Sequence, residues 1–240
     1  MFDPKTKKFR EFLIPRMKLN PTSILAGDGG KVWMLGWNTD LLIRFDTATE
    51  KFVEYTIPTK NSNPYDLAQD KKGRVWFIQR AGNKVTMFDP KTEKFKEWRI
   101  AYQIQSALGT IIDANDKIWY LQMVDNELVR FDPETGKSEE FRLPKNKGTQ
   151  DMALDSHGNI WLVQSTDNRL LKFNVESKIF QDFNIPTGES KPNSLTVDKK
   201  NNVWFTEGAK DKFGMLDVKK VGEVESKLKV KFKPPKDIFR

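Results

Sequence analysis

Five tryptophans recur at an almost constant spacing and constrain this chain more than any other feature. They are Trp33, Trp76, Trp119, Trp161 and Trp204, in steps of 43, 43, 42 and 43 residues. An aspartate or asparagine keeps the same step, at Asp3, Asp46, Asp89, Asp132, Asn174 and Asp217. A period in the low forties with turn residues at fixed offsets is typical of four-stranded propeller blades. Because one blade cannot bury both of its faces alone, the repeats must stack side by side.

The second repeat indicates how one unit is built. Its expected strands are 67–70, 75–79, 84–88 and 95–100, with the shortest one nearest the axis. Gly73 supplies the positive φ that the first hairpin turn needs. Asp89 and Pro90 begin the turn between the last two strands, because aspartate accepts backbone hydrogen bonds and proline presets φ. We interpret these motifs as structural, and the tryptophans as apolar wedges between blades.

The sequence therefore predicts an all-β fold, a β-propeller of five four-stranded blades in a domain over residues 1–218. Four complete blades are expected over 21–58, 64–101, 107–144 and 149–186, and the fifth, 192–218, lacks its last strand. The segment 9–14 has the pattern of that strand, so we expect it to pair with the C-terminal blade and close the ring. Residues 228–233, which alternate apolar and basic, are the alternative fourth strand. In that case the ring is open, or the chain forms part of a larger ring.

The net charge of +8 is concentrated at the C-terminal end. Residues 219–240 carry eight basic and three acidic side chains, whereas the lysines of the repeats are spread over turns beside glutamates. Nucleic-acid binding needs a concentrated basic face, so we expect no nucleic-acid partner for the repeats. We interpret 219–240, which include Pro234 and Pro235, as a basic tail that docks to a protein partner. Attachment of the tail to nucleic acid or to a membrane surface is the alternative.

The composition gives little information on the cellular compartment. No apolar run approaches the roughly 18 residues that span a bilayer, so we expect no transmembrane segment. The N-terminus opens inside a repeat without the apolar core of a signal peptide. We expect a soluble protein that is either cytoplasmic or a mature or trimmed exported chain. The chain has no cysteine and therefore no disulfide framework.

The repeats resemble those of a known family. Trp204, Phe205, Thr206 and Glu207, followed by Lys-Phe-Gly-Met-Leu-Asp at 212–217, are similar to the repeat of the streptogramin B lyases, or virginiamycin B lyases. Residues 75–79, 117–122 and 159–164 look like looser copies, so the resemblance covers nearly the whole chain up to about Asp217. It implies a seven-bladed propeller that opens the ester of a cyclic antibiotic by elimination. It also implies a histidine base and a magnesium ion near the axis.

The chain departs from that family pattern in two ways. It has room for only five repeats, and it has a single histidine, His157. This residue occupies the turn between the first and second strands of its repeat, which points away from the mouth where strand one begins. A general base must lie within hydrogen-bond reach of a substrate proton. We therefore expect His157 to be a solvated turn residue, and no family histidine can be carried over.

In a propeller, the start of strand one and the end of strand two converge from every blade on one axial mouth. Two offsets from the tryptophan are mostly polar there. The residues ten before it are Ser23, Asp66, Gly109, Asp151 and Ser194, and those three after it are Gly36, Gln79, Gln122, Gln164 and Glu207. Oxygen ligands suit magnesium or calcium, so Asp66, Asp151 and Glu207 are candidate metal ligands. Ordered water could fill the same channel.

Four residues after the tryptophan, the first two repeats place Trp37 and Arg80 next to this mouth. Trp37 could stack on an organic ligand, with packing over Gly36 as the alternative. Arg80 could bind a ligand together with Gln79, Gln122 and Gln164, or it could pair with Asp66 and leave no charge for a metal.

Because the family's histidines are missing, we expect a non-catalytic propeller that binds a small molecule or protein partner at the axial mouth, or serves as a scaffold, with no certain cofactor. The alternative is a magnesium- or calcium-dependent lyase or lactone hydrolase. In it, Asp66, Asp151 or Glu207 would act as metal ligand or base, since a metal can polarise a carbonyl and activate water without any histidine.

Overall fold

A computed structural model describes residues 4–15, 19–100, 104, 106–144 and 148–218, and it describes 2–3 and 228–229 through their backbone alone. Every strand pair among these residues is antiparallel. The one helix described is a short 3-10 turn, Asp28–Gly30. No helix of the described residues has the length and apolarity that a membrane span requires. The fold is thus all-β, as predicted.

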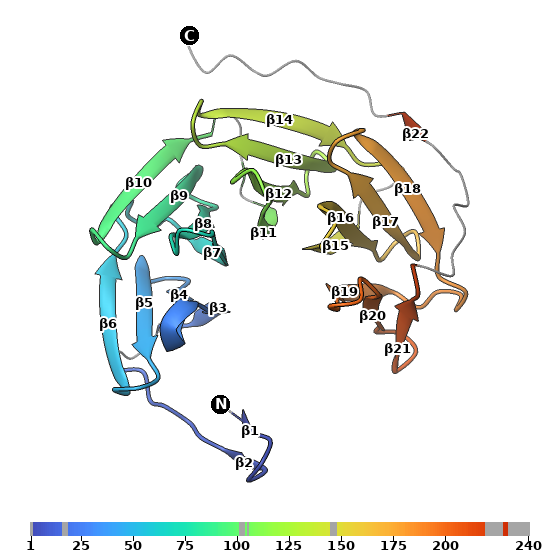
Figure 1. Ribbon diagram of the computed structural model, residues 1–240. Helices are drawn as coiled ribbons and strands as arrows, with labels where there is room; N and C mark the ends of the chain where they lie inside the picture. The colour runs from blue at the N-terminus through green and yellow to red at the C-terminus, as the bar shows by residue number, and fades with distance from the viewer. Residues whose placement is uncertain are drawn as a thin grey trace.

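Five sheets of consecutive strands correspond to the five repeats (Figure 1). Blade one holds β3 (Pro21–Ala26), β4 (Lys31–Gly36), β5 (Leu41–Asp46) and β6 (Lys51–Thr56), and blade two holds β7 (Pro64–Gln69), β8 (Val75–Gln79), β9 (Lys84–Asp89) and β10 (Lys94–Arg99). Blade three holds β11 (Ala107–Ile112), β12 (Ile118–Gln122), β13 (Glu127–Asp132) and β14 (Lys137–Arg142). Blade four holds β15 (Thr149–Leu154), β16 (Asn159–Gln164), β17 (Arg169–Asn174) and β18 (Ile179–Asn184), and blade five holds β19 (Pro192–Val197), β20 (Val203–Glu207) and β21 (Lys212–Leu216).

The blades follow an arc with the first strand of each, β3, β7, β11, β15 and β19, nearest the axis (Figure 1). Apolar clusters fill the four interfaces between successive blades. Four of the repeat tryptophans, Trp33, Trp76, Trp119 and Trp161, are at most 1% exposed, which confirms their predicted role as wedges. The predicted aspartate turns are also confirmed, since Asp89 accepts a hydrogen bond from the Lys91 amide at 2.9 Å.

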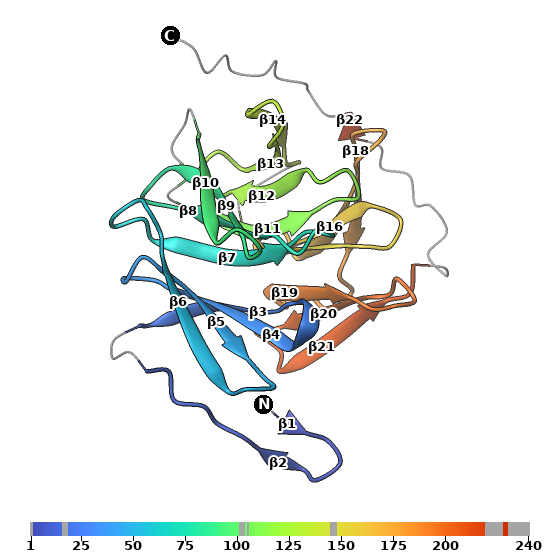
Figure 2. The same cartoon turned by 60° about the vertical axis from the view of Figure 1, so that its left-hand side comes forward.

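The predicted pairing of residues 9–14 with the C-terminal blade is not observed. The sheet of blade five has three strands, and the arc is open between blades five and one (Figure 1). At the N-terminus, β1 (Phe2–Asp3) pairs instead with β2 (Lys8–Phe9), beside blade one (Figure 2). The N-terminal segment packs on blade one because Phe12 contacts Phe45, with 4.6 Å between the ring centres. The N-terminal segment therefore rests on blade one.

The alternative fourth strand of blade five, 228–233, is not observed there either. Its described part, β22 (Leu228–Lys229), pairs with Ile179 and Phe180 on the outer edge of β18 in blade four. The other residues of the predicted basic tail, 219–227 and 230–240, lie outside the described residues.

The inner strand of each blade is irregular near its start. The register shifts by one residue there, for example between Tyr65 and Leu67 in blade two. Asp66 adopts φ +55° and Gly109 adopts φ +65°, as residues at a bulge commonly do. The bulge lets β7 begin at Pro64 rather than at Leu67 as predicted, because the strand continues on both sides of it.

Candidate functional site

Asp66 and Asp151 lie at these bulges and tie neighbouring blades together. The two carboxylate oxygens of Asp66 accept hydrogen bonds from the amides of Leu67, at 3.0 Å, and of Thr110 in blade three, at 2.9 Å. Asp151 repeats the arrangement, accepting from the Met152 amide at 2.9 Å and from the Leu195 amide of blade five at 3.0 Å. Each carboxylate thus joins the inner strand of its own blade to that of the next.

The environment of Asp66 disfavours its charge. Burial raises the pKa of Asp66, and this effect outweighs the two backbone hydrogen bonds, which lower it. The negative charge of Asp151 raises the same pKa further. The two candidate metal ligands therefore repel each other electrostatically while their oxygens accept backbone amides.

The three glutamines are turned into the protein. Gln79 donates from Nε2 to Thr86 Oγ1 at 2.7 Å and to Glu97 Oε1 at 2.6 Å, and Gln79 is fully buried. Gln122 Nε2 donates to Asp125 Oδ2 at 3.0 Å, and Gln164 Nε2 donates to Thr149 Oγ1 at 3.3 Å. These bonds tie the end of strand two to neighbouring segments. A ligand-binding role for the three amides stays a prediction.

Glu207 is 5% exposed, and its Oε2 has no hydrogen-bond partner among the described residues. Nowhere in the described part of the chain do three or more His, Cys, Asp or Glu residues come close enough together to hold a metal ion. Asp66, Asp151 and Glu207 thus do not form the three-carboxylate site that the sequence suggested. As they stand, these residues do not fit a magnesium or calcium ion held by all three.

Trp37 and Arg80 do meet at the mouth, together with Tyr65. The Arg80 guanidinium lies 3.5 Å from the centre of the Tyr65 ring and 5.4 Å from that of Trp37. The two rings themselves meet edge to face at 5.7 Å. Arg80 Nε donates to the Ala107 carbonyl of blade three at 2.7 Å, and no ion pair between Arg80 and Asp66 is found among the described residues. Tyr65 was not among the predicted site residues, although its place directly before Asp66 was a usable signal.

Burial lowers the pKa of Arg80 from its ordinary value, although Tyr65 and the Asp66 charge act against that shift. The guanidinium remains the cation of this cluster, because arginine in proteins stays protonated. A half-buried cation between two aromatic rings suits an anionic or aromatic group that approaches the mouth.

A second set of aspartates, six residues before the tryptophan, was also missed. Their Oδ2 atoms accept the indole N–H at 2.8–3.0 Å, in the pairs Asp70–Trp76, Asp113–Trp119, Asp155–Trp161 and Asp198–Trp204. Their Oδ1 atoms accept amides of the following turn. Blade one has Gly27 at this offset, and the Trp33 indole N–H has no partner among the described residues. The constant offset could have revealed this structural role.

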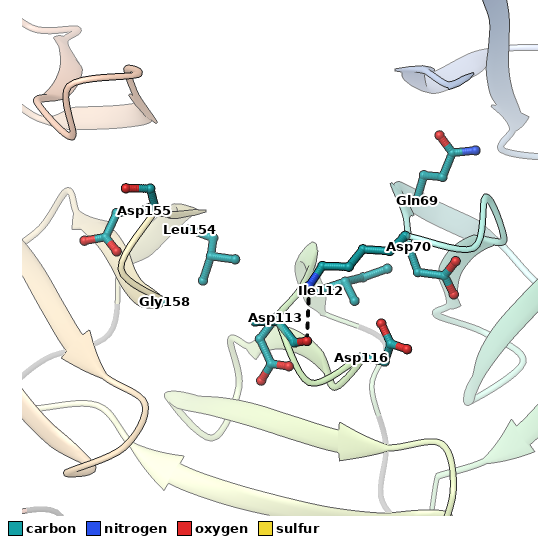
Figure 3. A pocket seen from close by; sticks show the side chains of 11 residues that line it. Gln69, Asp70, Ile112, Asp113, Asp116, Leu154, Asp155 and Gly158 are labelled. Atoms are coloured by element: carbon teal, nitrogen blue, oxygen red, sulfur yellow. Dashed lines mark hydrogen bonds between the residues drawn. The ribbon is translucent and has the colours of Figure 1, made fainter. Parts of the chain in front are cut away.

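A cavity of about 220 Å³ lies at the turn ends of blades two, three and four (Figure 3). Gln69, Ile112 and Leu154, each just before a turn aspartate, contribute to its lining. Asp70, Asp113 and Asp155 border it, but their oxygens hold the tryptophans and the turns. This cavity therefore offers mainly apolar contacts and backbone groups rather than a free set of carboxylates.

The model of the virginiamycin B lyase family matches residues 4–238, nearly the whole chain. The chain belongs to the virginiamycin B lyase family. The structure is similar to that of virginiamycin B lyase from Staphylococcus aureus, with a TM-score of 0.73 and 24% identity, over 84% of this chain and 71% of that one. A streptogramin B lyase gives a TM-score of 0.75 at 21% identity, over 89% and 74% of the two chains. The curated protein sequences contain no match to the chain.

One further S. aureus structure is similar to this member of the virginiamycin B lyase family. It is a catalytically inactive histidine-to-alanine variant with quinupristin, similar at a TM-score of 0.78 and 21% identity, over 95% of this chain and 74% of that one. In the present chain, His157 lies in the turn after Asp155, as predicted. Its amide donates to Asp155 Oδ1 at 2.9 Å, and its Nδ1 lies 3.2 Å from Asn201 Nδ2 in blade five.

Proposed function

We propose that this member of the virginiamycin B lyase family is a non-catalytic binding or scaffold propeller that takes a small molecule or a protein partner at its axial mouth. The observation that carries the proposal is the cluster of Trp37, Tyr65 and Arg80. A guanidinium supported by two rings can present a charge and a flat surface to one ligand. The chemistry that fits is an aromatic or planar anionic group.

The neighbouring residues support binding rather than turnover. Both oxygens of Asp66 and of Asp151 accept backbone amides from two blades, so neither carboxylate is available as an unhindered base. The only histidine, His157, lies at the turn end of its blade, whereas the Trp37 cluster lies where strand one begins. A base so far from the mouth could not reach a proton of a ligand bound there.

Quinupristin, which accompanies the S. aureus lyase variant, is a suitable probe for this proposal. We expect quinupristin to quench tryptophan fluorescence on binding, with no opening of its ring in the presence of magnesium. Trp37→Phe and Arg80→Gln should each weaken that binding at least several-fold. Val53→Ala, a change at an exposed side chain of the outer strand β6, is the matched control. Catalytic ring opening by the native chain would refute the non-catalytic assignment.

One observation favours the enzymatic alternative, a magnesium- or calcium-dependent lyase or lactone hydrolase. Glu207 is buried, and one of its oxygens lacks a partner among the described residues. A buried carboxylate is costly unless it is paired, bound to a cation or protonated. Glu207 is therefore the residue through which a metal-dependent activity would operate.

Thermal unfolding after chelation, followed by addition of magnesium or calcium, separates the two functions. A specific ion at about 100 times its dissociation constant adds roughly 2.7 kcal/mol. For a domain of this size, that corresponds to a rise in melting temperature of about 5–10 °C. A rise that disappears in Glu207→Gln would favour the enzyme, whereas an unchanged melting temperature supports the binding propeller.

A further inference from the structure

A hollow of about 240 Å³ lies between blades two and three, at the ends of the strands opposite the mouth. Blade two contributes side chains from its first turn and its three outer strands: Lys72, Arg74, Trp76, Met87, Lys96 and Trp98. Blade three contributes residues of its two turns at this end, among them Asn115 and Pro133. We call this hollow the inter-blade pocket.

Blade two differs from blade three in one pair of opposed residues on its two outer strands. Lys96 of β10 lies opposite Met87 of β9, whereas the equivalent pair in blade three is Glu139 opposite Arg130. Arg130 and Glu139 form an ion pair at 2.5 Å, so their charges offset each other. In blade two, the cation lies on the fourth strand instead of the third, and the residue opposite it is uncharged.

In blades one, three and four, the cation of the third strand lies over the repeat tryptophan. The distances from its charged group to the ring centre are 6.0 Å for Arg44, 5.8 Å for Arg130 and 5.9 Å for Lys172. Met87 takes this place in blade two, so the third strand brings no charge to the wall of the pocket. The fourth strand supplies a charge instead, through Lys96.

The surroundings of Lys96 combine a cation with an aromatic surface. Lys96 is exposed, and its Nζ lies 4.6 Å from the centre of the Trp98 ring. Among the described residues, no carboxylate lies within ion-pair distance of Lys96. Trp98 stacks on Trp76 at 5.4 Å and meets Phe131 of blade three edge to face at 5.8 Å. Trp98 is thus held in place by two rings, yet it remains partly exposed and lines the pocket.

The other three cations that line the pocket each have a carboxylate within ion-pair distance. The pairs are Arg74–Asp70 at 2.6 Å, Lys117–Asp132 at 2.9 Å and Lys72–Asp116 at 3.6 Å. Glu134, the remaining carboxylate of the lining, lies 3.8 Å from Lys117. Because the side chain of Glu134 is 85% exposed, solvent screens its charge. The pocket therefore has a place for one negative charge, beside Lys96.

The pocket also offers apolar contacts to a flat ring. Trp98, Met87 and Pro133 line it, and both indole rings and methionine sulfurs make favourable contacts with aromatic groups. A ligand with one carboxylate and one ring would use both parts of the pocket. A phosphate group, which carries more charge, would need a second cation without a partner, and the described lining residues offer only Lys96.

We propose that the inter-blade pocket binds a small aromatic monocarboxylate, with the carboxylate against Lys96 and the ring against Trp98 and Met87. This site is separate from the one proposed at the mouth, because the two share no residue. It arises where one repeat departs from the charge arrangement of its neighbours.

Benzoate is the probe, and the indole N–H signals of the seven tryptophans in ¹H–¹⁵N NMR are the measurement. Trp98→Phe identifies the signal of Trp98 by its loss. Benzoate at constant ionic strength should shift that signal saturably, with a dissociation constant of about 1 mM for a ligand of this size. The absence of a saturable shift at about ten times that concentration would overturn the proposal.

A pair of matched substitutions tests the role of the lysine. Lys96→Gln should weaken benzoate binding, as seen at the Trp98 signal, at least about five-fold, because the charge that offsets the carboxylate is lost. Lys51→Gln removes the same charge from an exposed site on the outer strand of blade one and should bind like the native chain. Equal affinities in the two variants would contradict the proposed site.

A double variant transfers the ion pair of blade three into blade two. Met87→Arg combined with Lys96→Glu sets an arginine opposite a glutamate, as Arg130 lies opposite Glu139. The new pair should occupy the pocket and abolish the benzoate shift of the Trp98 signal, while circular dichroism verifies the fold. Retention of the native affinity in a folded double variant would overturn the proposal.

The signal of Trp37, identified with Trp37→Phe, separates this pocket from the mouth. Arg80→Gln should remove any benzoate shift of the Trp37 signal and leave that of Trp98 unchanged. A Trp98 shift that disappears in Arg80→Gln would mean that one site at the mouth causes both responses, and it would overturn the inter-blade pocket. A response of Trp98 without any response of Trp37 would support the pocket and count against the mouth alone.

Discussion

At the scale of single residues, the buried indole N–H groups explain why the aspartates six residues before the tryptophans recur. A polar group buried without a partner costs about 1–3 kcal/mol. Asp113 meets that need by accepting the Trp119 indole N–H at 2.8 Å and two turn amides. Blade one, which has Gly27 at this offset, leaves the Trp33 N–H without a partner among the described residues.

This difference allows a matched pair of substitutions. Trp33→Phe and Trp119→Phe remove the same atoms from equally buried sites, but only the second breaks a hydrogen bond. We expect Trp119→Phe to lower the free energy of unfolding by about 1–2 kcal/mol more than Trp33→Phe does. Equilibrium urea unfolding of the two variants measures the difference. Equal losses would show that the aspartate contributes no stability through the indole.

The same contacts make stability depend on pH. Hydrogen bonds from Trp204 and Asn202, with smaller effects of the turn amides, lower the pKa of Asp198 from 3.8 to about 2. Because the folded pKa lies below the unfolded one, the stabilisation is present above pH 3.8 and is lost as the pH falls through 2.

Between pH 4 and pH 2, the free energy of unfolding of Asp198→Asn should therefore fall less steeply than that of the native chain. The difference in slope should correspond to at most about one bound proton. Urea unfolding at several pH values in this window measures the slope. An unchanged slope would mean that Asp198 titrates alike in the folded and unfolded states.

At the scale of single strands, periodicity predicted the second strands well and the first strands less well. Val75–Gln79 was predicted and is observed as β8, because its residues are apolar and buried on both faces. The inner strand was predicted to begin at Leu67 but begins at Pro64. Residue patterns do not reveal a bulge at Asp66, since its left-handed φ is imposed by contacts with the next blade.

The bulge of blade three predicts a cost for adding a side chain. Gly109 has φ +65°, and a Cβ there would lie 3.0 Å from Met152 Cγ and Cε. Gly109→Ala should lower the free energy of unfolding by about 1–2 kcal/mol, because a left-handed backbone disfavours a Cβ. Gly188→Ala, with open space around its Cβ and no positive φ, should change stability by less than about 0.5 kcal/mol. Urea unfolding that ranks the two alike would contradict this role of the bulge.

At the scale of the whole molecule, the repeat predicted the five blades and the burial of four repeat tryptophans but not where the two ends of the chain pack. The local residue pattern identified 9–14 as an outer strand. In agreement, Phe12 contacts Phe45 of blade one much as Tyr55, from an outer strand, contacts Phe88 of blade two. Which sheet receives that strand depends on the curvature of the arc, and curvature arises from packing angles summed over four interfaces. The prediction of the mouth was likewise partly confirmed. Trp37 and Arg80 meet there, whereas Asp66 and Asp151 hydrogen-bond neighbouring blades together.

The packing of the N-terminal segment on blade one predicts how two neighbouring substitutions change stability. Phe12 is partly buried against Phe45, whereas the next residue, Leu13, is 92% exposed. Phe12→Ala should therefore lower the free energy of unfolding by about 1–3 kcal/mol, less than for a fully buried phenylalanine. Leu13→Ala should change it by less than about 0.5 kcal/mol.

Equilibrium urea unfolding of both variants under identical conditions measures the difference. Losing Phe12 removes one of the two described aromatic neighbours of Phe45, so hydrogen exchange in β5 should accelerate as well. If Phe12→Ala and Leu13→Ala behaved alike in both measurements, the N-terminal segment would not rest on blade one in solution.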